Sequence, residues 1–483
     1  VELSAEQIDG VEAVYFNDAP VTLDGQGRVT SEPWVKNERR TTSTTVTIGV
    51  GGTVTFAAPG PVVSATPPYV ASPGADGENF YSATFEGSNI TVNGPPGASA
   101  RVTYQYQAQT PKAKVWWHLG TSGQTADARL IELFPEQWTE AHRLRGIAYL
   151  VAELDYDQDA FQQGVPNISA LIRGSRVFDP RTSTTVWSEN PALLIRHYAL
   201  HPLGGNLPAG SVSDAHCIAA ANACDQVVAY TVDGVVENRP LYTAGTVAKS
   251  GSRPLDVIGE LAEAMAGKVA YSNNRLIMRA GVWTPPVVAL GEGDVSDAGE
   301  IEIMAQIARE QLVNAVTGLF TNPAVNWQAV DFPRVAAQAY IDADGRELPV
   351  DVEFGAINHA GQAQQVAATM IRDARQALTI TASFKLRAYP IELFDVVSLT
   401  LPRFGWASKQ FEVLNRRWTL EGGVRLTLKE IDPTIYELGT AFSAADPAPN
   451  TSLPRPWEVP TVGPISASSG TAWLVRQPDG TII

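Results

Sequence analysis

The sequence predicts a mainly β protein of several domains with an α+β region in its middle, and three observations lead to this fold class. The chain has 483 residues, more than one compact core usually accommodates, so about two to four domains are expected. Apolar and polar residues alternate with period two, as in half-buried strands, toward both ends of the chain. Helical spacing with capping residues is concentrated between about 190 and 285.

Residues 1–189 are expected to form a β-rich domain. The segments EAVYFNDAPV and LDGQGRVT predict a strand, a turn and a second strand. From about 44 to 110, alternating segments separated by Gly-containing turns predict a small β module inserted into this domain. The later run LRGIAYLVAEL is nearly apolar on both faces, so we expect it to be an internal strand of its sheet.

Residues 190–298 are expected to form an α+β domain. Asn190 is a helix cap, and Pro191 follows in the first turn, where its missing N–H removes no hydrogen bond. The segment SDAHCIAAANACDQ predicts a second helix, and RPLDVIGELAEAMAG predicts a third that stops at Gly267. KVAYSNNRLIMRAG then predicts a hairpin that turns at Asn273-Asn274.

Residues 299–440 are expected to form a β-rich domain that contains a helix at about 359–378. The segments TITASFKLRAYPI, FDVVSLTLP, QFEVLNRRWTL and GGVRLTLKEI predict an antiparallel meander whose last turn is Glu421-Gly422-Gly423. The Pro-rich composition of 441–464 predicts an extended linker, and a new β domain should start within 465–483.

The composition is that of an ordinary folded protein and narrows the chemistry. Hydrophobic residues make up 44% and charged residues 18% of the chain. The net charge of −16 argues against binding to a phosphate backbone as the main role. No stretch has the unbroken apolar length of a membrane span, and no signal peptide opens the sequence. Because the chain starts at Val1 and stops within a half-completed hairpin, we expect it to be a segment of a longer polypeptide.

The two cysteines, Cys217 and Cys224, are seven residues apart in a predicted helix. That spacing places them on one face, two turns apart and too far to form a disulfide easily. We therefore expect buried free thiols and no disulfide framework.

Asp155, Asp157 and Asp159 alternate as the first ligands of a calcium loop do. An EF-hand loop also needs Gly at its sixth position and Glu at its twelfth. Here those positions hold Ala160 and Pro166, so we interpret the segment as the exit of a strand into a surface turn. An irregular metal site near these aspartates stays open.

His197 and His201 have the i, i+4 spacing that binds zinc in metalloproteases, but that motif needs Glu beside the first His, where Tyr198 stands. No convincing third ligand follows, although His216 and Cys217 are close in sequence. We therefore interpret the pair as histidines at a helix C-terminus, where the helix dipole favours them.

Catalytic motifs are absent from the sequence. It contains no G-x-S-x-G elbow, no phosphate-binding P-loop and no G-x-G-x-x-G fingerprint. A carboxylate pair for glycoside hydrolysis needs only spatial proximity and stays open. We expect no enzyme, and we assign no catalytic, cofactor-binding or metal-binding residue and no cofactor.

One long segment carries a family pattern: R-G-x-A-Y, then F-x-x-G-x-P-N, then V-x-G-x-x-V-Y-D-P-R, then W-S-D-N-P-A. The matching residues are Arg145-Gly146, Ala148-Tyr149, Phe161, Gly164, Pro166-Asn167, Gly174, Val177-Phe178-Asp179-Pro180-Arg181 and Trp187-Ser188-Glu189-Asn190-Pro191-Ala192. With later blocks in the same order, this segment resembles the tail-tip proteins of tailed phages of the lambda host-specificity (J) type, over about 112–437. Departures are mild: Phe178 replaces Tyr, Glu189 replaces Asp, and Ser183 stands where Gly is common.

This resemblance implies a structural central hub of a phage tail tip, located in the virion and assembled in the host cytoplasm. The family implies a homotrimer around the tail axis with barrel-like β domains, followed by fibronectin type III-like and receptor-binding regions beyond the linker. It implies contacts with other tail-tip and distal tail proteins, the tape measure protein and a host receptor, and DNA passing through the channel without specific binding.

The main hypothesis is therefore a hub that joins the tail tube to the tip fibre and takes part in host attachment and DNA ejection. One alternative is a tail-associated peptidoglycan hydrolase. A second alternative is a receptor- or carbohydrate-binding module that uses exposed tryptophans.

Overall fold

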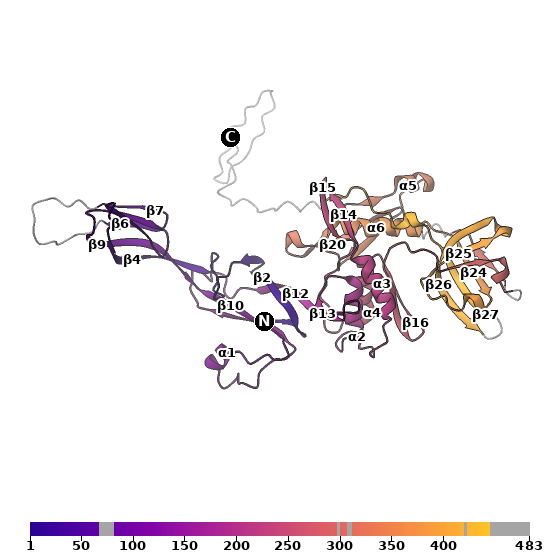
Figure 1. Cartoon of the computed structure of the whole chain (residues 1–483), viewed down its shortest axis with the longest axis horizontal. Coiled ribbons are helices and arrows are strands. Elements are labelled where there is room, and N and C mark those ends of the chain that lie inside the picture. Colours follow the sequence, from indigo (N-terminus) through magenta and orange to yellow (C-terminus); the bar gives the residue numbers. More distant parts are fainter. Residues whose placement is uncertain (67–81, 297–299, 307–311, 420–422, 445–483) are drawn as a thin grey trace, which may run out of the picture.

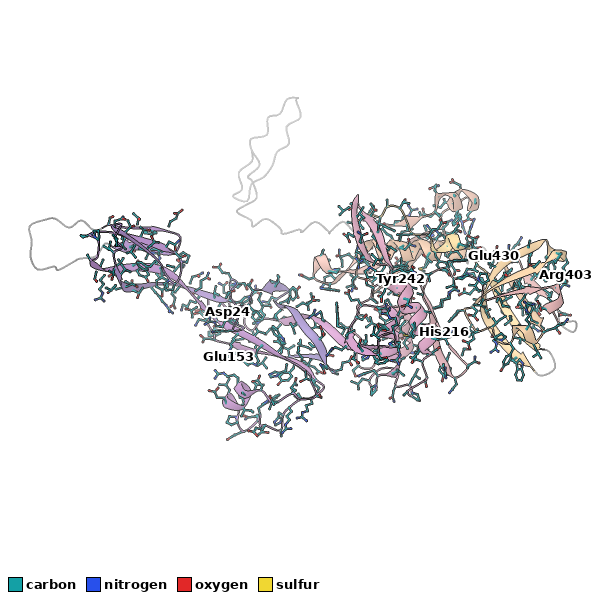
Figure 2. All side chains as sticks on the ribbon, viewed as in Figure 1. Asp24, Glu153, His216, Tyr242, Arg403 and Glu430 are labelled. Atoms are coloured by element: carbon teal, nitrogen blue, oxygen red, sulfur yellow. The ribbon has the colours of Figure 1, made fainter. Side chains whose placement is uncertain are left out.

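The computed structural model describes residues 1–66, 82–296, 300–306, 312–419 and 423–444. Within them, four packed units follow one another along the longest axis of the molecule (Figure 1). A small β module stands at one end, followed by the N-terminal β domain, a unit rich in helices and a large β-sheet. Side chains fill each of these units (Figure 2).

The N-terminal β domain consists of two sheets, with strand orders β1-β11-β10 and β13-β12-β2-β3. Its elements are β1 (Glu2–Ser4), β2 (Ile8–Phe16), β3 (Ala19–Val21), β10 (Ala113–Leu119), α1 (Ala128–Leu133), β11 (Ala148–Leu154), β12 (Ile168–Asp179) and β13 (Thr184–Trp187). The predicted internal strand is confirmed, because β11 lies between β1 and β10. Trp34 anchors the core, with its ring centroid 5.1 Å from that of Phe16 and 5.5 Å from that of Phe161.

The β module is inserted between β3 and β10 and has a core of its own. Its sheets have the orders β4-β9-β6 and β5-β8-β7. Its strands are β4 (Val35–Thr47), β5 (Thr53–Ala57), β6 (Val62–Thr66), β7 (Ser82–Glu86), β8 (Asn89–Asn93) and β9 (Ser99–Pro111). The β4–β9 pairing runs without interruption from Val35 opposite Pro111 to Thr47 opposite Ser99, so one two-stranded ribbon connects the module to the domain.

The unit rich in helices follows β13 along the chain. It contains α2 (Pro191–Leu200), α3 (Asp214–Cys224), β14 (Val227–Val232), β15 (Val235–Pro240), α4 (Pro254–Ala264), β16 (Lys268–Ser272) and β17 (Arg275–Arg279). The Asn190 side chain caps α2 by accepting hydrogen bonds from the backbone N–H groups of Ala192 and Leu193. Asn273 and Asn274 both have positive φ and form the predicted hairpin turn.

The two cysteines are buried free thiols on α3, as predicted. Burial raises the pKa of Cys217 to about 12. Burial likewise raises the pKa of Cys224. Both side chains therefore act as small apolar groups in the core.

The helix predicted at 359–378 is present as α6 (Ala360–Ala374), with His359 as its N-cap. It follows β20 (Ala315–Asn322), β21 (Gln328–Asp331), β22 (Val335–Ala336), α5 (Gln338–Asp344) and β23 (Pro349–Phe354). Buried residues of α6 and β20 belong to the same hydrophobic cluster as those of α2, α3 and α4. Packing therefore differs from the expected boundary at 298/299, because residues 312–374 complete the unit rich in helices.

The large sheet has six strands in the order β18-β25-β26-β27-β24-β19. They are β18 (Val288–Gly291), β19 (Glu302–Met304), β24 (Thr379–Phe384), β25 (Val396–Leu401), β26 (Trp406–Thr419) and β27 (Gly423–Glu430). The predicted four-strand meander is wrong at β24, which pairs with β27 and not with β25. The connection from β24 to β25 contains a 3-10 helix, η4 (Leu386–Ala388), and is longer than a hairpin turn.

The mainly β fold class with an α+β middle is confirmed. The barrel-like β domains that the resemblance implies, including the one at 299–440, are not found among the described residues, where the sheets are open and none closes into a barrel. Across the same residues, no helix combines the length and apolar character needed to cross a bilayer. Three expectations lie outside the described residues: part of the turn at 421–423, most of the linker at 441–464, and the new domain at 465–483.

Candidate functional site

The acidic turn after β11 is held by lysines. An Asp155 carboxylate oxygen lies 2.7 Å from Lys112 Nζ, and an Asp157 carboxylate oxygen lies 3.1 Å from Lys36 Nζ. The hydrogen bond from Lys36 holds the pKa of Asp157 below its ordinary value. Within the described part of the chain, the three aspartates do not form a group whose ligand atoms are close enough to share one ion.

The glycines of the family pattern set the geometry of the turns around this segment. Gly146 has φ +80° and Gly164 has φ +84°, a conformation that glycine adopts without steric cost. Asn167 joins the turn after β2, because its N–H donates to the Asn17 side chain and its carbonyl accepts from the Asn17 N–H. Ser183, which stands where Gly is common in the family, also has positive φ (56°).

His197 and His201 meet a carboxylate from the other end of the sequence. Glu6 lies between β1 and β2, and its Oε2 is 3.1 Å from His197 Nε2 and 3.2 Å from His201 Nε2. The Ser175 hydroxyl donates a hydrogen bond to the other oxygen, Oε1. Burial raises the pKa of Glu6, but the hydrogen bonds from His197 and Ser175 and the charges of the two histidines outweigh it, so the pKa lies below its ordinary value.

A buried carboxylate joins the large sheet to the unit rich in helices. Glu412 of β26 is 2% exposed, and its oxygens lie 2.7 Å from Lys268 Nζ and 3.1 Å from Arg279 Nη1. Lys268 and Arg279 face each other at the open end of the β16–β17 hairpin. Burial lowers the pKa of Lys268, but the charges of Glu412 and Asp373 and the hydrogen bond to Glu412 together outweigh burial, so the pKa lies above its ordinary value. Arg279 also donates to the Phe394 carbonyl at 2.9 Å.

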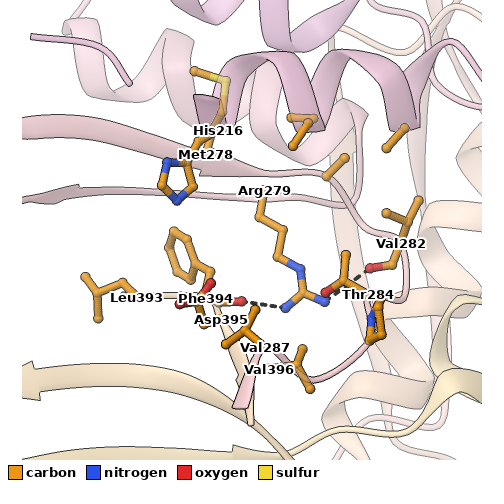
Figure 3. A pocket seen from close by; sticks show the side chains of 15 residues that line it. His216, Met278, Arg279, Val282, Thr284, Val287, Leu393, Phe394, Asp395 and Val396 are labelled. Carbon is orange, nitrogen blue, oxygen red and sulfur yellow. Dashed lines mark hydrogen bonds between the residues drawn. The ribbon is translucent and has the colours of Figure 1, made fainter. Parts of the chain in front are cut away.

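The contact of Glu412 with Lys268 and Arg279 is called the joint below. A cavity of about 200 Å³ lies beside it, between α3, β17 and the start of β25. Figure 3 shows Arg279 crossing it toward the carbonyls of Phe394 and Val282, with His216 and Asp395 nearby. A second cavity of about 180 Å³ is lined by Glu392 and polar residues around the Asn273 turn. Both are below the roughly 300–1,000 Å³ of typical small-molecule sites. Each is lined by a single carboxylate, so neither contains an acid pair for glycoside hydrolysis.

Three glutamines of α6 bind backbone groups of other segments, and sequence analysis missed all of them. Gln362 is fully buried, and its Nε2 donates to the carbonyls of Thr243 at 2.7 Å and Ala264 at 2.8 Å. Its Oε1 accepts from the Thr243 N–H. The run AGQAQQ places three amide side chains next to apolar helical positions. Amides in such positions indicate a helix that forms hydrogen bonds with buried backbone groups.

The other two glutamines hold the chain that follows the large sheet. Gln364 donates to the Ser443 carbonyl at 2.6 Å and accepts from the Ser443 N–H at 3.2 Å. Gln365 donates to the Glu437 carbonyl and accepts from the Gly439 N–H. The C-terminal segment of the described chain is therefore anchored on the unit rich in helices.

The β module projects away from the rest of the molecule on its ribbon (Figure 1). Hydroxyl side chains pair across its strands, as between Ser43 and Thr103 at 2.8 Å and between Thr55 and Thr91 at 2.9 Å.

Comparison with known proteins finds similarity over several of the units described above. A family described as putative phage tail protein matches residues 253–416, which run from α4 into β26. Baseplate hub protein pb3 of Escherichia phage T5 is 19% identical over 365 residues, which cover 69% of this chain. These similarities support a phage tail protein of the hub type. The chain spans 38% of the length of pb3.

Two solved structures similar to this chain come from a virion and from a prophage tail protein. A chain of the virion of a native gene transfer agent particle has a TM-score of 0.47 and 14% identity, covering 88% of this chain and 91% of that chain. A 43 kDa tail protein of prophage MuSo2 from Shewanella oneidensis has a TM-score of 0.29 and 9% identity, covering 74% and 76%.

The sequence similarities thus support a structural phage tail protein. The residues that the sequence suggested for metal binding lie in separate places: the aspartates in the turn held by Lys36 and Lys112, His197 and His201 beside Glu6, and His216 at the first cavity.

Proposed function

We propose that this chain is the central hub of a phage tail tip, where it joins the tail tube to the tip fibre and takes part in host attachment and DNA ejection. The observation that carries the proposal is the similarity to a protein named as a baseplate hub over 365 residues. The buried contact of Glu412 with Lys268 and Arg279 supports it, because a hub needs its domains fixed relative to one another.

The hub acts as a homotrimer around the tail axis. The large sheet ends on one side at β19, where Met304 is 65% exposed. An open edge with an exposed apolar side chain invites pairing, and a closed ring of subunits covers such edges. Its further partners are other tail-tip and distal tail proteins and the tape measure protein, and the host receptor binds C-terminal regions beyond this chain.

The acidic character of the chain suits a channel for DNA. A net charge of −16 repels the phosphate backbone, so DNA can move past the hub without being retained. Assembly takes place in the host cytoplasm, and the finished hub resides at the tail tip.

Particle reconstruction tests this proposal directly. Cryo-electron microscopy of intact tails should place three copies of the chain on the axis at the tip. Density for the chain away from the tip, or a number of copies other than three, would overturn the hub assignment.

The hub acts without catalysis. Each of the two cavities is lined by one carboxylate, so neither offers the acid pair that a tail-associated peptidoglycan hydrolase of the glycosidase type would need. Zymography on peptidoglycan should therefore show no clearing, whereas a cleared band that depends on this chain would favour the hydrolase. In the same way, a chain that ends at Ile483 should not bind the host, and retained binding would favour a receptor-binding module.

A further inference from the structure

We propose that Glu6, His197 and His201 form a binding site for a divalent transition metal of the Zn²⁺ class, which cross-links the N-terminal β domain to helix α2. The inference is independent of the hub proposal, because it rests only on the geometry of these three side chains.

The sequence alone does not reveal this site, because its three residues come from distant parts of the chain. His197 lies in the last turn of α2 and His201 caps its C-terminus, so both imidazoles leave one face of the helix. Glu6 precedes β2 and is 191 residues away from His197 in sequence. Antiparallel pairing of β2 with β12 places Ile8 opposite Ser175 and so brings Glu6 to the helix.

The distances between the three side chains fit one ion. At metal–ligand bonds of about 2.0–2.1 Å, tetrahedral ligand atoms are separated by roughly 3.3–3.4 Å. Glu6 Oε2 lies 3.1 Å from His197 Nε2 and 3.2 Å from His201 Nε2. One ligand atom from each residue falls within 4.8 Å of the others, so small rotations of the side chains suffice to coordinate an ion.

The set of donors selects the metal class. Two imidazoles and one carboxylate are the ligands of zinc sites that keep a fourth position for water, and imidazole favours transition metals over Mg²⁺ or Ca²⁺. All three side chains are partly exposed, at 23% for His197, 24% for His201 and 27% for Glu6. An ion from solution therefore has access to the site.

The surroundings of Glu6 support metal binding. The Ser175 hydroxyl binds Oε1 and leaves Oε2 directed at the two imidazoles. Hydrogen bonds of this kind orient the ligating oxygen in metal sites. Ser175 belongs to β12, so its position is fixed by the sheet.

Binding requires one proton to move on His201. Its Nδ1 accepts a hydrogen bond from the Leu203 N–H at 3.2 Å, which places the proton of the neutral ring on Nε2. When Nε2 binds the ion, the proton resides on Nδ1, and the hydrogen bond from the Leu203 N–H is lost. Without metal, the same Nε2 proton is donated to Glu6, so the cluster is held together in both states.

The experiment uses the whole chain, stripped with a chelator and titrated with ZnCl₂ by calorimetry and with CoCl₂ by visible absorption. We expect one ion per chain and the intense d–d bands of four-coordinate Co²⁺. Glu6→Gln and His197→Asn should each weaken Zn²⁺ binding at least tenfold. Zn²⁺ should raise the melting temperature of the wild type and leave that of both variants unchanged.

The matched control is Glu392→Gln. It removes a carboxylate 3.5 Å from His216, a single histidine–carboxylate pair outside the cluster, and should bind Zn²⁺ like the wild type. Wild-type protein without a four-coordinate Co²⁺ spectrum would overturn the proposal even if the variants failed to fold. Equal Zn²⁺ affinity of the wild type and folded Glu6→Gln would also overturn it.

Discussion

The Glu412 carboxylate lies 2.7 Å from the Lys268 ammonium group, across the boundary between the large sheet and the unit rich in helices. The carboxylate is almost completely buried, and Arg279 occupies its other oxygen. A buried carboxylate with two cationic donors is satisfied only when both units are in place, so this contact fixes their relative orientation.

Glu412→Gln should destabilise the chain by about 3 kcal/mol. The neutral amide leaves Arg279 without its counter-charge, whereas Lys268, 34% exposed, recovers part of its hydration. Urea unfolding followed by tryptophan fluorescence measures the loss. The control Glu302→Gln, which removes an exposed partner of Arg425, should change the unfolding midpoint little. Equal effects of the two substitutions would show that the joint contributes no more than a surface pair.

Gln362→Met should lower the free energy of unfolding by about 2 to 3 kcal/mol, although Met has a similar length and higher hydrophobicity. The substitution leaves the N–H and carbonyl of Thr243 and the carbonyl of Ala264 without their partner inside the core. Gln338→Met on the exposed helix α5 provides the control, since Gln338 bonds only to a nearby exposed Asp342 in the described contacts. A gain in thermal stability for Gln362→Met would contradict this account.

Ser183→Gly should stabilise the chain by about 0.5 to 1 kcal/mol, because Ser183 adopts a positive φ that costs energy for any residue with a Cβ. Ser169→Gly in strand β12 supplies the opposite case and should destabilise by a similar amount. Thermal unfolding of the two variants beside the wild type measures both shifts. Destabilisation by both glycines would mean that the turn does not require left-handed backbone.

Cys217 and Cys224 should resist alkylation by iodoacetamide in the native chain at pH 8. Burial raises the pKa of Cys217 to about 12, so the reactive thiolate is scarce as well as inaccessible at that pH. Mass spectrometry should find two labels per chain in urea and almost none without it. Rapid labelling of the native chain would show that α3 opens readily.

Local patterns predicted much of the fold because their causes are local. The Asn190 cap, the Asn273-Asn274 turn and the internal strand β11 each depend on residues adjacent in sequence. The pairing of β24 with β27 could not be predicted in this way, since it depends on a connection that crosses the sheet. The same limit applies to α6, whose apolar face predicts burial but does not say which core receives it.

The residues of the candidate sites show the same difference between features set by local sequence and features set by tertiary packing. The sequence places His197 and His201 one helical turn apart, a spacing within α2 that needs no tertiary information. Glu6 could not be found, because only the β2–β12 register brings it to the helix. Glu412 was hidden for a related reason: its partners Lys268 and Arg279 face it only after two units have packed.

The two hydrogen bonds between Gln364 and Ser443 have a mechanical consequence. The amide holds both the N–H and the carbonyl of one residue, and Gln365 holds two more backbone groups just before it. Tension on the chain beyond residue 444 therefore reaches the hydrogen bonds of Gln364 and then those of Gln365 before it reaches the large sheet. The load passes into α6 and the core around it, and the large sheet is spared.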